Sequence, residues 1–136
     1  MLSVSVFFNV TSLPDSIYEY TKDSLEHMVK EGAFPDLIQV GNEIINGMLW
    51  PVAKVDPLGM ENWDLFVKLL ESGAKACREI CPKAKIIIHT EKAGEWNKIK
   101  TYYNHLWQLD YDIIGLSYYS MWHKAVGVPV SYTHLT

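Results

Sequence analysis

The stretch at residues 37–43, LIQVGNE, decides how the whole chain is interpreted. Its first four residues form a short, nearly continuous apolar run, which is typical of a strand buried in a parallel sheet. Gly41 ends the run, and two polar residues, Asn42 and Glu43, follow directly. Parallel sheets and barrels bind ligands at the carboxyl ends of their strands, so we expect functional side chains at this point.

Two further runs of strand length have the same character, one at residues 85–89 (KIIIH) and one at residues 112–119 (DIIGLSYY). Segments with helical spacing of apolar residues precede the three runs: Asp15–Glu31, Glu61–Ile80 and Trp96–Leu109. The segment 44–60 is rich in Gly and Pro and is predicted to be a long loop. Strict alternation of helix and strand predicts an α/β fold with a parallel sheet and right-handed crossovers.

Composition narrows the possible functions. The chain has 136 residues, with 12 basic and 16 acidic side chains and a net charge of −4, which argues against a nucleic-acid partner or an anionic membrane surface. No glycine-rich phosphate loop is present, and Cys77 and Cys81 lack further metal ligands at suitable spacing, so we expect no cofactor and no metal. Residues 1–10 resemble neither an export signal nor a membrane anchor. A complete (β/α)8 barrel needs about 250 residues, more than this chain has.

The polar and aromatic residues near the strand ends suit a sugar. Carboxylates, an amide, imidazoles and flat aromatic rings fit the hydroxyl groups and apolar faces of carbohydrates better than they fit a phosphate. In addition to Asn42 and Glu43, the candidates are Trp50, His89, Glu91, Tyr118 and Trp122. Glu43 and Glu91 also form a possible pair for glycoside hydrolysis, which needs two carboxyl groups.

Each candidate also has a purely structural interpretation. Asn42-Glu43 fits a helix-capping turn as well as a catalytic pair. A histidine at a strand end, such as His89, is more often structural than functional. Tyr118 and Tyr119 point in opposite directions along a strand, so only one of them can face a barrel interior.

Residues 41–51, GNEIINGMLWP, resemble the signature of the endo-β-1,4-galactanases of glycoside hydrolase family 53, which degrade arabinogalactan. The similarity continues at residues 62–63, 86–89, 112–119 and 122–123, and it covers roughly Ile17 to Lys124.

The resemblance implies a partial (β/α)8 barrel, about strands 4 to 6 with their helices, with residues 13–125 as the central part of the catalytic domain. It implies that Glu43 is the general acid/base and that Asn42 contacts the region of the sugar 2-hydroxyl. The nucleophile would be a second Glu beyond residue 136, which demotes Glu91 to a substrate-binding acid. His89, Trp50, Tyr118 and Trp122 become candidate sugar contacts. Ser120 stands where the family commonly has proline, so the path of that loop is left open.

From this resemblance we expect a fragment of a retaining endo-β-1,4-galactanase that is inactive alone and whose full-length parent is secreted or periplasmic. The expected partner is a galactan or arabinogalactan polysaccharide, and the oligomeric state is left open. Residues 1–12 and 126–136 match no expected part of the domain and could be foreign to the native sequence.

Two alternatives remain at this stage. One is a non-catalytic carbohydrate-binding α/β domain, complete at this length, that uses Trp50, Tyr118 and Trp122 as stacking platforms. The other is a hydrolase of the same clan that acts on another β-linked polysaccharide, because a fold alone does not fix the substrate.

Overall fold

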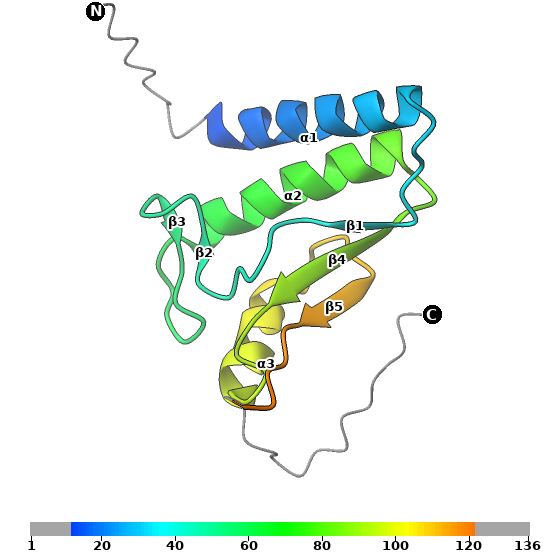
Figure 1. The fold of residues 1–136 in the computed structure, drawn as a ribbon. Helices are drawn as coiled ribbons and strands as arrows, with labels where there is room; N and C mark the ends of the chain where they lie inside the picture. The colour runs from blue at the N-terminus through cyan, green and yellow to red at the C-terminus, as the bar shows by residue number, and fades with distance from the viewer. Residues whose placement is uncertain (1–11, 122–136) are drawn as a thin grey trace, which may run out of the picture.

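The computed structural model describes residues 12–121, which form three helices and two small sheets (Figure 1). The elements follow in this order: α1 (Leu13–Lys30), β1 (Leu37–Gln39), β2 (Gly47–Met48), β3 (Ala53–Lys54), α2 (Trp63–Ile80), β4 (Lys85–Thr90), α3 (Trp96–His105) and β5 (Ile113–Leu116). All three predicted helices and all three predicted strands are confirmed.

Three details differ from the sequence prediction. Helix α3 ends at His105 rather than at Leu109, because the next residues form tight turns in which Leu106 and Leu109 each donate to the carbonyl three residues earlier. Strand β5 ends at Leu116, before the two tyrosines. The predicted loop at residues 44–60 contains a short antiparallel hairpin made by β2 and β3.

The main sheet has the order β1-β4-β5, and both pairings are parallel. The β2–β3 hairpin and helix α2 lie in the connection from β1 to β4, and α3 connects β4 to β5, so the three strands of the main sheet lie side by side in chain order. In the register of the second pairing, His89 lies opposite Gly115. This arrangement of consecutive strand and helix units is that of a barrel segment, and residues 12–121 do not close into a barrel.

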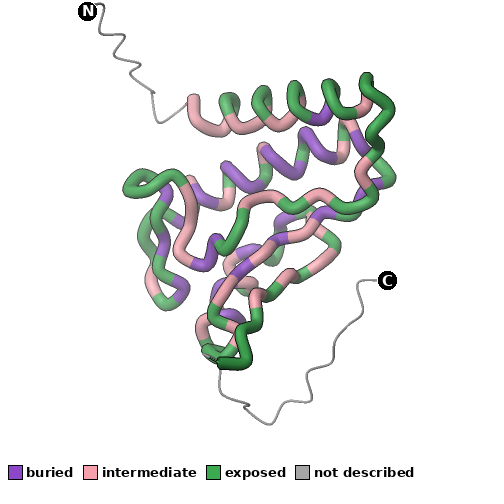
Figure 2. The backbone as a smooth tube through the Cα atoms, viewed as in Figure 1, coloured by how far each residue is buried: buried purple, intermediate pink, exposed green. Residues whose placement is uncertain are grey.

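The two faces of the sheet differ in burial (Figure 2). On β4, the side chains of Ile86, Ile88 and Thr90 are fully buried, whereas Ile87 and His89 on the opposite face are half-buried. The buried face packs against helices α2 and α3 through a cluster of large side chains: Phe66, Leu69, Leu70, Ile99, Tyr102 and Leu106. His89 therefore lies on the face that the helices leave open.

Trp63 anchors the irregular segment between the hairpin and α2. Its indole Nε1 donates to the carbonyls of Asp56 (3.1 Å) and Gly59 (3.0 Å), and its ring stacks on His105 with the centroids 3.9 Å apart. Trp63 is only 4% exposed, so its side chain belongs to the core. It ties residues 56–59 to α3.

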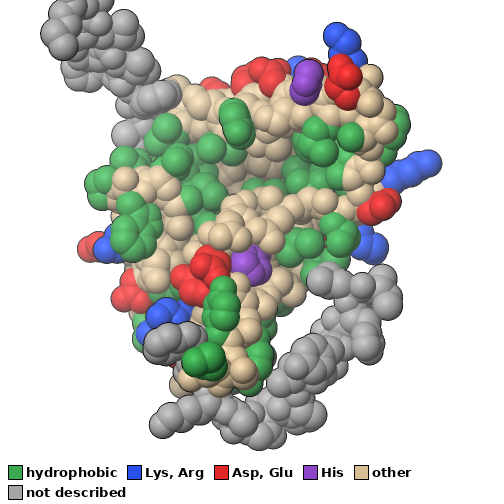
Figure 3. Space-filling view, in the orientation of Figure 1, with side chains coloured by type: hydrophobic (Ala, Val, Ile, Leu, Met, Phe, Trp, Pro, Cys, Tyr) green, Lys and Arg blue, Asp and Glu red, His purple; other side chains and the backbone are tan. Residues whose placement is uncertain are grey.

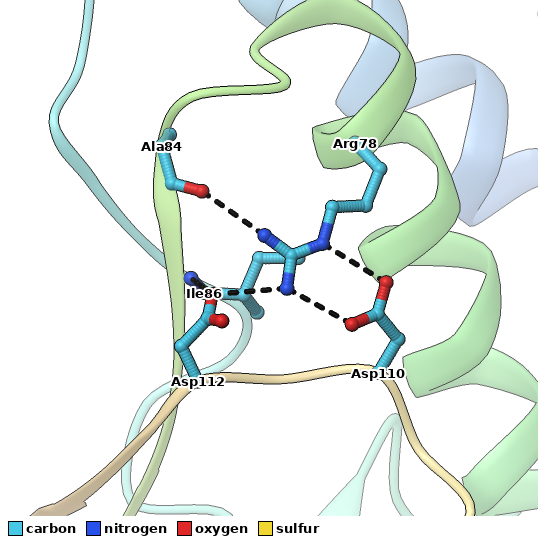
Figure 4. Close-up of polar contacts among 5 residues, drawn as sticks. All are labelled: Arg78, Ala84, Ile86, Asp110 and Asp112. Carbon is cyan, nitrogen blue, oxygen red and sulfur yellow. Dashed lines mark hydrogen bonds and ion pairs between the residues drawn. The ribbon is translucent and has the colours of Figure 1, made fainter.

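Arg78 ties α2 to the amino-terminal ends of β4 and β5 (Figure 4). Its guanidinium donates twice to Asp110 and once to Asp112, each at 2.9 Å, and once to the carbonyl of Ala84 at 3.1 Å. Asp112 also accepts the backbone N–H of Ile86 at 2.8 Å. This network lies at the end of the sheet opposite to residues 41–43, so it serves stability rather than the candidate site.

Replacing Arg78 by Met in the full-length protein is expected to lower the free energy of unfolding by about 1–2 kcal/mol, because partly exposed carboxylates lose charged hydrogen bonds. The Arg78 guanidinium holds the pKa of Asp110 below its ordinary value, and the Ile86 amide, followed by Arg78, does the same for Asp112. A lowered folded-state pKa gives stability that is complete above the ordinary aspartate value of about 3.9 and is lost as the pH falls through the folded value. Urea unfolding at pH 7 and at pH 3 measures both effects.

The matched control is Lys68→Met, which removes one exposed cation from the same helix. It should leave the urea midpoint nearly unchanged at both pH values. If Arg78→Met destabilised the protein equally at pH 7 and at pH 3, the loss would come from packing of the arginine stem rather than from the two carboxylates.

None of the helices within residues 12–121 is both long enough and apolar enough to cross a membrane.

Candidate functional site

The chain turns sharply after β1. Val40 continues the pairing by donating its N–H to the Ile87 carbonyl at 3.1 Å, and Gly41 then adopts a left-handed φ of 80°. A Cβ at Gly41 would lie 2.8 Å from Ile44 Cδ1, so a side chain at this position would meet both backbone strain and a clash. Glycine thus allows the next residues to fold back over the end of the sheet.

Asn42 and Glu43 lie at this turn, and both side chains are exposed. The Asn42 Oδ1 accepts a hydrogen bond from Gln39 Nε2 at 3.1 Å, and the same Gln39 nitrogen donates to the Gly41 carbonyl at 2.8 Å. Glu43 has a φ of 49°, which is an uncommon conformation for a residue with a side chain. The exposed carboxyl group of Glu43 can therefore contact a ligand, while the backbone of this residue is held in one conformation.

Three consecutive backbone N–H groups hold this loop against the end of β4. Glu43 N–H donates to His89 Nδ1 at 3.2 Å, and Ile44 N–H donates to the His89 carbonyl at 3.1 Å. Ile45 N–H donates to Glu91 Oε2 at 3.4 Å. The two sequence motifs, 41–43 and 89–91, are thus brought together as predicted from their positions after neighbouring strands.

The His89 ring is held from both sides. Because Nδ1 accepts the Glu43 N–H, the ring proton belongs on Nε2, which lies 2.9 Å from Ser117 Oγ and donates to it. Gly115 faces the ring across the sheet, where an added Cβ would lie 3.1 Å from His89 Cδ2. Glycine at this position therefore leaves the space that the imidazole occupies.

Figure 3 shows this part of the surface, where acidic side chains lie beside a histidine near the carboxyl end of β4. Within residues 12–121, no group of three or more His, Cys, Asp or Glu side chains is arranged to hold a metal ion. Cys77 and Cys81 are buried free thiols.

Trp50 lies in the turn between β2 and β3, where it precedes a cis peptide bond to Pro51. Its indole Nε1 donates to the Asn46 carbonyl at 2.9 Å, and Lys54 Nζ lies 4.3 Å from the ring centroid in a cation–π contact. The side chain is nevertheless 60% exposed. Trp50 is therefore a fixed aromatic surface that a sugar ring could reach.

An open hollow of about 720 Å³ lies beside this hairpin. Its walls come from residues 46–62, including Asn46, Pro51 and Lys54, and they include neither Glu43 nor His89. The hollow and the polar cluster around Glu43 and His89 therefore lie at different places on the surface. We locate the candidate site at Glu43, because that is where a free carboxyl group lies beside an organised polar cluster.

The aromatic residues after β5 lie at the end of the part of the chain that the structure describes. Tyr118 and Tyr119 lie beyond the end of the strand and are 39% and 54% exposed. Continued strand alternation would put Ser117 and Tyr119, rather than Tyr118, on the side of His89. Trp122, also predicted as a sugar contact, lies outside the described residues.

Sequence reasoning did not find the roles of Ser117 and Gln39. Ser117 bonds the His89 ring, and Gln39 bonds both the Gly41 carbonyl and the Asn42 amide. Ser117 stands at a strand end, which is the one signal that could have drawn attention to it. Gln39 is the single polar residue inside the apolar run 37–40. A polar residue in such a run usually has a specific hydrogen-bond partner, and this is the signal that could have identified it.

Comparison with known proteins places this geometry in a family. The sequence profile described as glycosyl hydrolase family 53 matches residues 6–131, which extends a few residues past each end of the predicted domain at 13–125. An uncharacterised protein of Niallia circulans is 36% identical over 116 residues, covering 82% of this chain and 32% of that protein. A probable arabinogalactan endo-β-1,4-galactanase A of Aspergillus flavus is 30% identical, covering 94% of this chain and 38% of that protein.

Two solved structures agree in fold. A fungal β-1,4-galactanase matches with a TM-score of 0.73 and 28% identity, covering 85% of this chain and 36% of that one. The family 53 catalytic domain of Ignisphaera aggregans matches with a TM-score of 0.72 and 33% identity, and the match covers 89% of this chain and 32% of that one. The chain spans about a third of the length of the relatives it matches. The prediction of a partial (β/α)8 barrel is thereby confirmed, and the chain belongs to glycosyl hydrolase family 53.

Proposed function

We propose that the full-length protein is a retaining endo-β-1,4-galactanase and that residues 13–125 form the central part of its catalytic barrel. Its substrates are the β-1,4-galactosidic bonds of arabinogalactan and pectic galactan. The observation that carries this proposal is the placement of Glu43, an exposed carboxyl group held in a constrained backbone at the carboxyl end of β1. The family match and the relatives with galactanase names support it.

Glu43 is the general acid/base of this mechanism. In the first step its carboxyl proton goes to the glycosidic oxygen while a carboxylate nucleophile attacks the anomeric carbon and the glycosidic bond breaks. In the second step the Glu43 carboxylate takes a proton from water, and the water oxygen displaces the nucleophile. The nucleophile is a second Glu carried by another part of the full-length chain, outside the described residues.

The sugar contacts follow from the same placement. Asn42, next to Glu43, presents its amide near the sugar 2-hydroxyl, and Trp50 offers a fixed ring for stacking. Trp122 supplies a further aromatic contact, and so does Tyr118, which lies beyond the end of β5, where the strand no longer fixes the direction of its side chain. Glu91 uses one carboxylate oxygen for the Ile45 N–H and presents the other to a sugar hydroxyl.

The full-length enzyme acts outside the cytoplasm, either secreted or in a periplasm, because a polymeric substrate does not reach an intracellular enzyme. The proposed mechanism uses two carboxyl groups and water and requires no cofactor.

A substrate panel tests the proposal. The full-length enzyme is given galactan, mannan, xylan and glucan, and we expect kcat/KM for galactan to exceed the others by about 10²-fold or more, because a site built around specific hydroxyl groups rejects epimers. The product first formed should carry the β-anomeric configuration, as NMR of the fresh digest would reveal.

Other outcomes of the panel have definite meanings. Preference for another β-linked polymer would make the protein a hydrolase of the same clan with a different substrate. Binding of galactan without any hydrolysis would favour the carbohydrate-binding alternative.

A further inference from the structure

We propose that His89 is a positioning residue for Glu43 rather than a sugar contact, and that it acts through its Nδ1 atom in a tautomer set by Ser117. The inference rests on the proposed function, in which Glu43 is the acid/base. It concerns a role that neither the sequence pattern nor the family membership assigns.

The first step concerns the backbone of Glu43. Its φ of 49° lies in the left-handed region, which is unfavourable for a residue with a side chain. Such a conformation persists only where the surroundings fix it. Here the Glu43 N–H itself is bonded to His89 Nδ1, and the next amide, Ile44 N–H, is bonded to the His89 carbonyl. One residue of β4 therefore fixes two successive peptide groups of the loop.

The second step concerns the proton on the imidazole. A protonated Nδ1 could not accept the Glu43 N–H, so the ring must be neutral with its proton on Nε2. Ser117 Oγ, 2.9 Å from Nε2, accepts that proton's hydrogen bond and so favours this tautomer. Gly115 leaves the space in which the ring can lie between the two partners.

The third step separates positioning from sugar binding. Both ring nitrogens of His89 are used by protein atoms, one by the backbone of Glu43 and one by Ser117. A sugar hydroxyl could bond the ring only by displacing one of them. The direction of the Glu43 side chain follows from its backbone angles, and a displacement of about 1 Å at a reacting group can lower the rate about 100-fold.

Two substitutions divide the ring's functions. The Oδ1 of Asn stands the same number of bonds from Cα as His Nδ1, so His89→Asn keeps an acceptor for the Glu43 N–H. The Nε2 of Gln corresponds to His Nε2, so His89→Gln keeps a donor toward Ser117 and loses the acceptor. If His89 positions Glu43 through Nδ1, the His89→Asn enzyme should keep most of its activity and the His89→Gln enzyme should lose it. If His89 instead binds the sugar through Nε2, the His89→Gln enzyme should be the one that keeps activity.

The assay uses the full-length enzyme and aryl β-1,4-galactobiosides with two leaving groups, 2,4-dinitrophenol, which needs little protonation, and 4-methylphenol, which needs much. For His89→Gln, we expect kcat/KM on the methylphenyl substrate to fall about 100-fold and on the dinitrophenyl substrate to stay nearly unchanged. On the dinitrophenyl substrate kcat and KM should fall together, because the glycosyl-enzyme accumulates when the base is misplaced. His89→Asn should recover most of the methylphenyl activity.

Ser117→Ala provides an independent check, since it leaves the imidazole in place. It should lower kcat/KM on the methylphenyl substrate by up to about tenfold with the same dependence on the leaving group. Circular dichroism and urea unfolding of all three variants show whether each is folded.

Three results would overturn the inference. An equal fall for both leaving groups would indicate a general structural defect, and rescue by Gln rather than Asn, with a raised KM, would indicate a sugar contact. A wild-type enzyme that cleaves neither galactan nor the galactobiosides would refute the proposed function itself, and the inference with it. The first two results leave wild-type galactanase activity intact, so the two failures are distinguishable.

Discussion

Glu43→Gln in the full-length enzyme is expected to lower kcat/KM on galactan by about 10² to 10⁴, the range that general acid–base catalysis contributes. Glutamine has nearly the same shape, and the hydrogen bond from residue 43 to His89 comes from the backbone, so the loop should keep its conformation. The amide can neither donate a carboxyl proton to the glycosidic oxygen nor accept one from water. The loss should therefore be chemical rather than structural.

Azide provides the specific measurement. With a dinitrophenyl galactobioside the Glu43→Gln enzyme should still form the glycosyl-enzyme, because that leaving group departs without protonation. Azide, which needs no base, should then attack the anomeric carbon and release the nucleophilic carboxylate, giving β-galactobiosyl azide and a restored kcat. Formation of that product identifies the missing group as the acid/base.

Two further variants make the test decisive. Glu26→Gln removes an exposed carboxylate from α1 and should leave kcat/KM unchanged. Glu91→Gln should weaken binding without becoming dependent on azide. If Glu43→Gln kept full activity, or if azide rescued Glu91→Gln instead, the acid/base role would have to move to Glu91.

The elements of the fold could be predicted because their signals are local. The apolar run 37–40 and the run 85–89 are confirmed as adjacent parallel strands, and the helical spacing of residues 61–80 is confirmed as α2. The end of α3 could not be predicted in the same way. Leu106 and Leu109 are buried and continue the apolar pattern, so periodicity alone does not reveal that the chain has left the helix at His105.

The candidate site could be predicted in position but not in its internal contacts. The sequence points to Glu43, which directly follows one apolar run, and to His89, which ends the next, because parallel strands end at one edge of a sheet. Their hydrogen bond joins residues 46 apart in sequence, and the bond between His89 and Ser117 joins residues 28 apart. The first bond depends on the register of β1 against β4, and the second depends on the register that sets His89 opposite Gly115; register is a property of the packed sheet.

The hairpin shows the same limit on a smaller scale. Residues 44–60 contain several Gly and Pro residues, which predicts a loop and gives no period-2 pattern for two-residue strands. The pairing of Gly47 with Lys54 brings the lysine over the Trp50 ring. Trp50 could be predicted as an exposed aromatic residue, but its fixed orientation comes from contacts that form only after the hairpin closes.

The 136-residue chain by itself is expected to show no detectable hydrolysis of galactan and to associate in solution. A retaining mechanism needs two carboxyl groups about 5–5.5 Å apart, and the proposed nucleophile belongs to another part of the full-length chain. Within residues 12–121, β1 and β5 each pair with one strand only, so each has an open edge. Leu37, Ile114 and Leu116 on these strands are 45%, 49% and 41% exposed.

Open strand edges with apolar side chains pair with other copies of the same chain, and only closure of the barrel would remove them. Light scattering after size exclusion should therefore give a mass above that of the 15.6 kDa monomer, rising with concentration. A monomer that melts cooperatively and binds galactan would instead fit a complete carbohydrate-binding domain. Hydrolysis by the isolated chain that Glu43→Gln abolished would mean that its own residues supply the second carboxyl group, and the mechanism would have to be assigned within the chain.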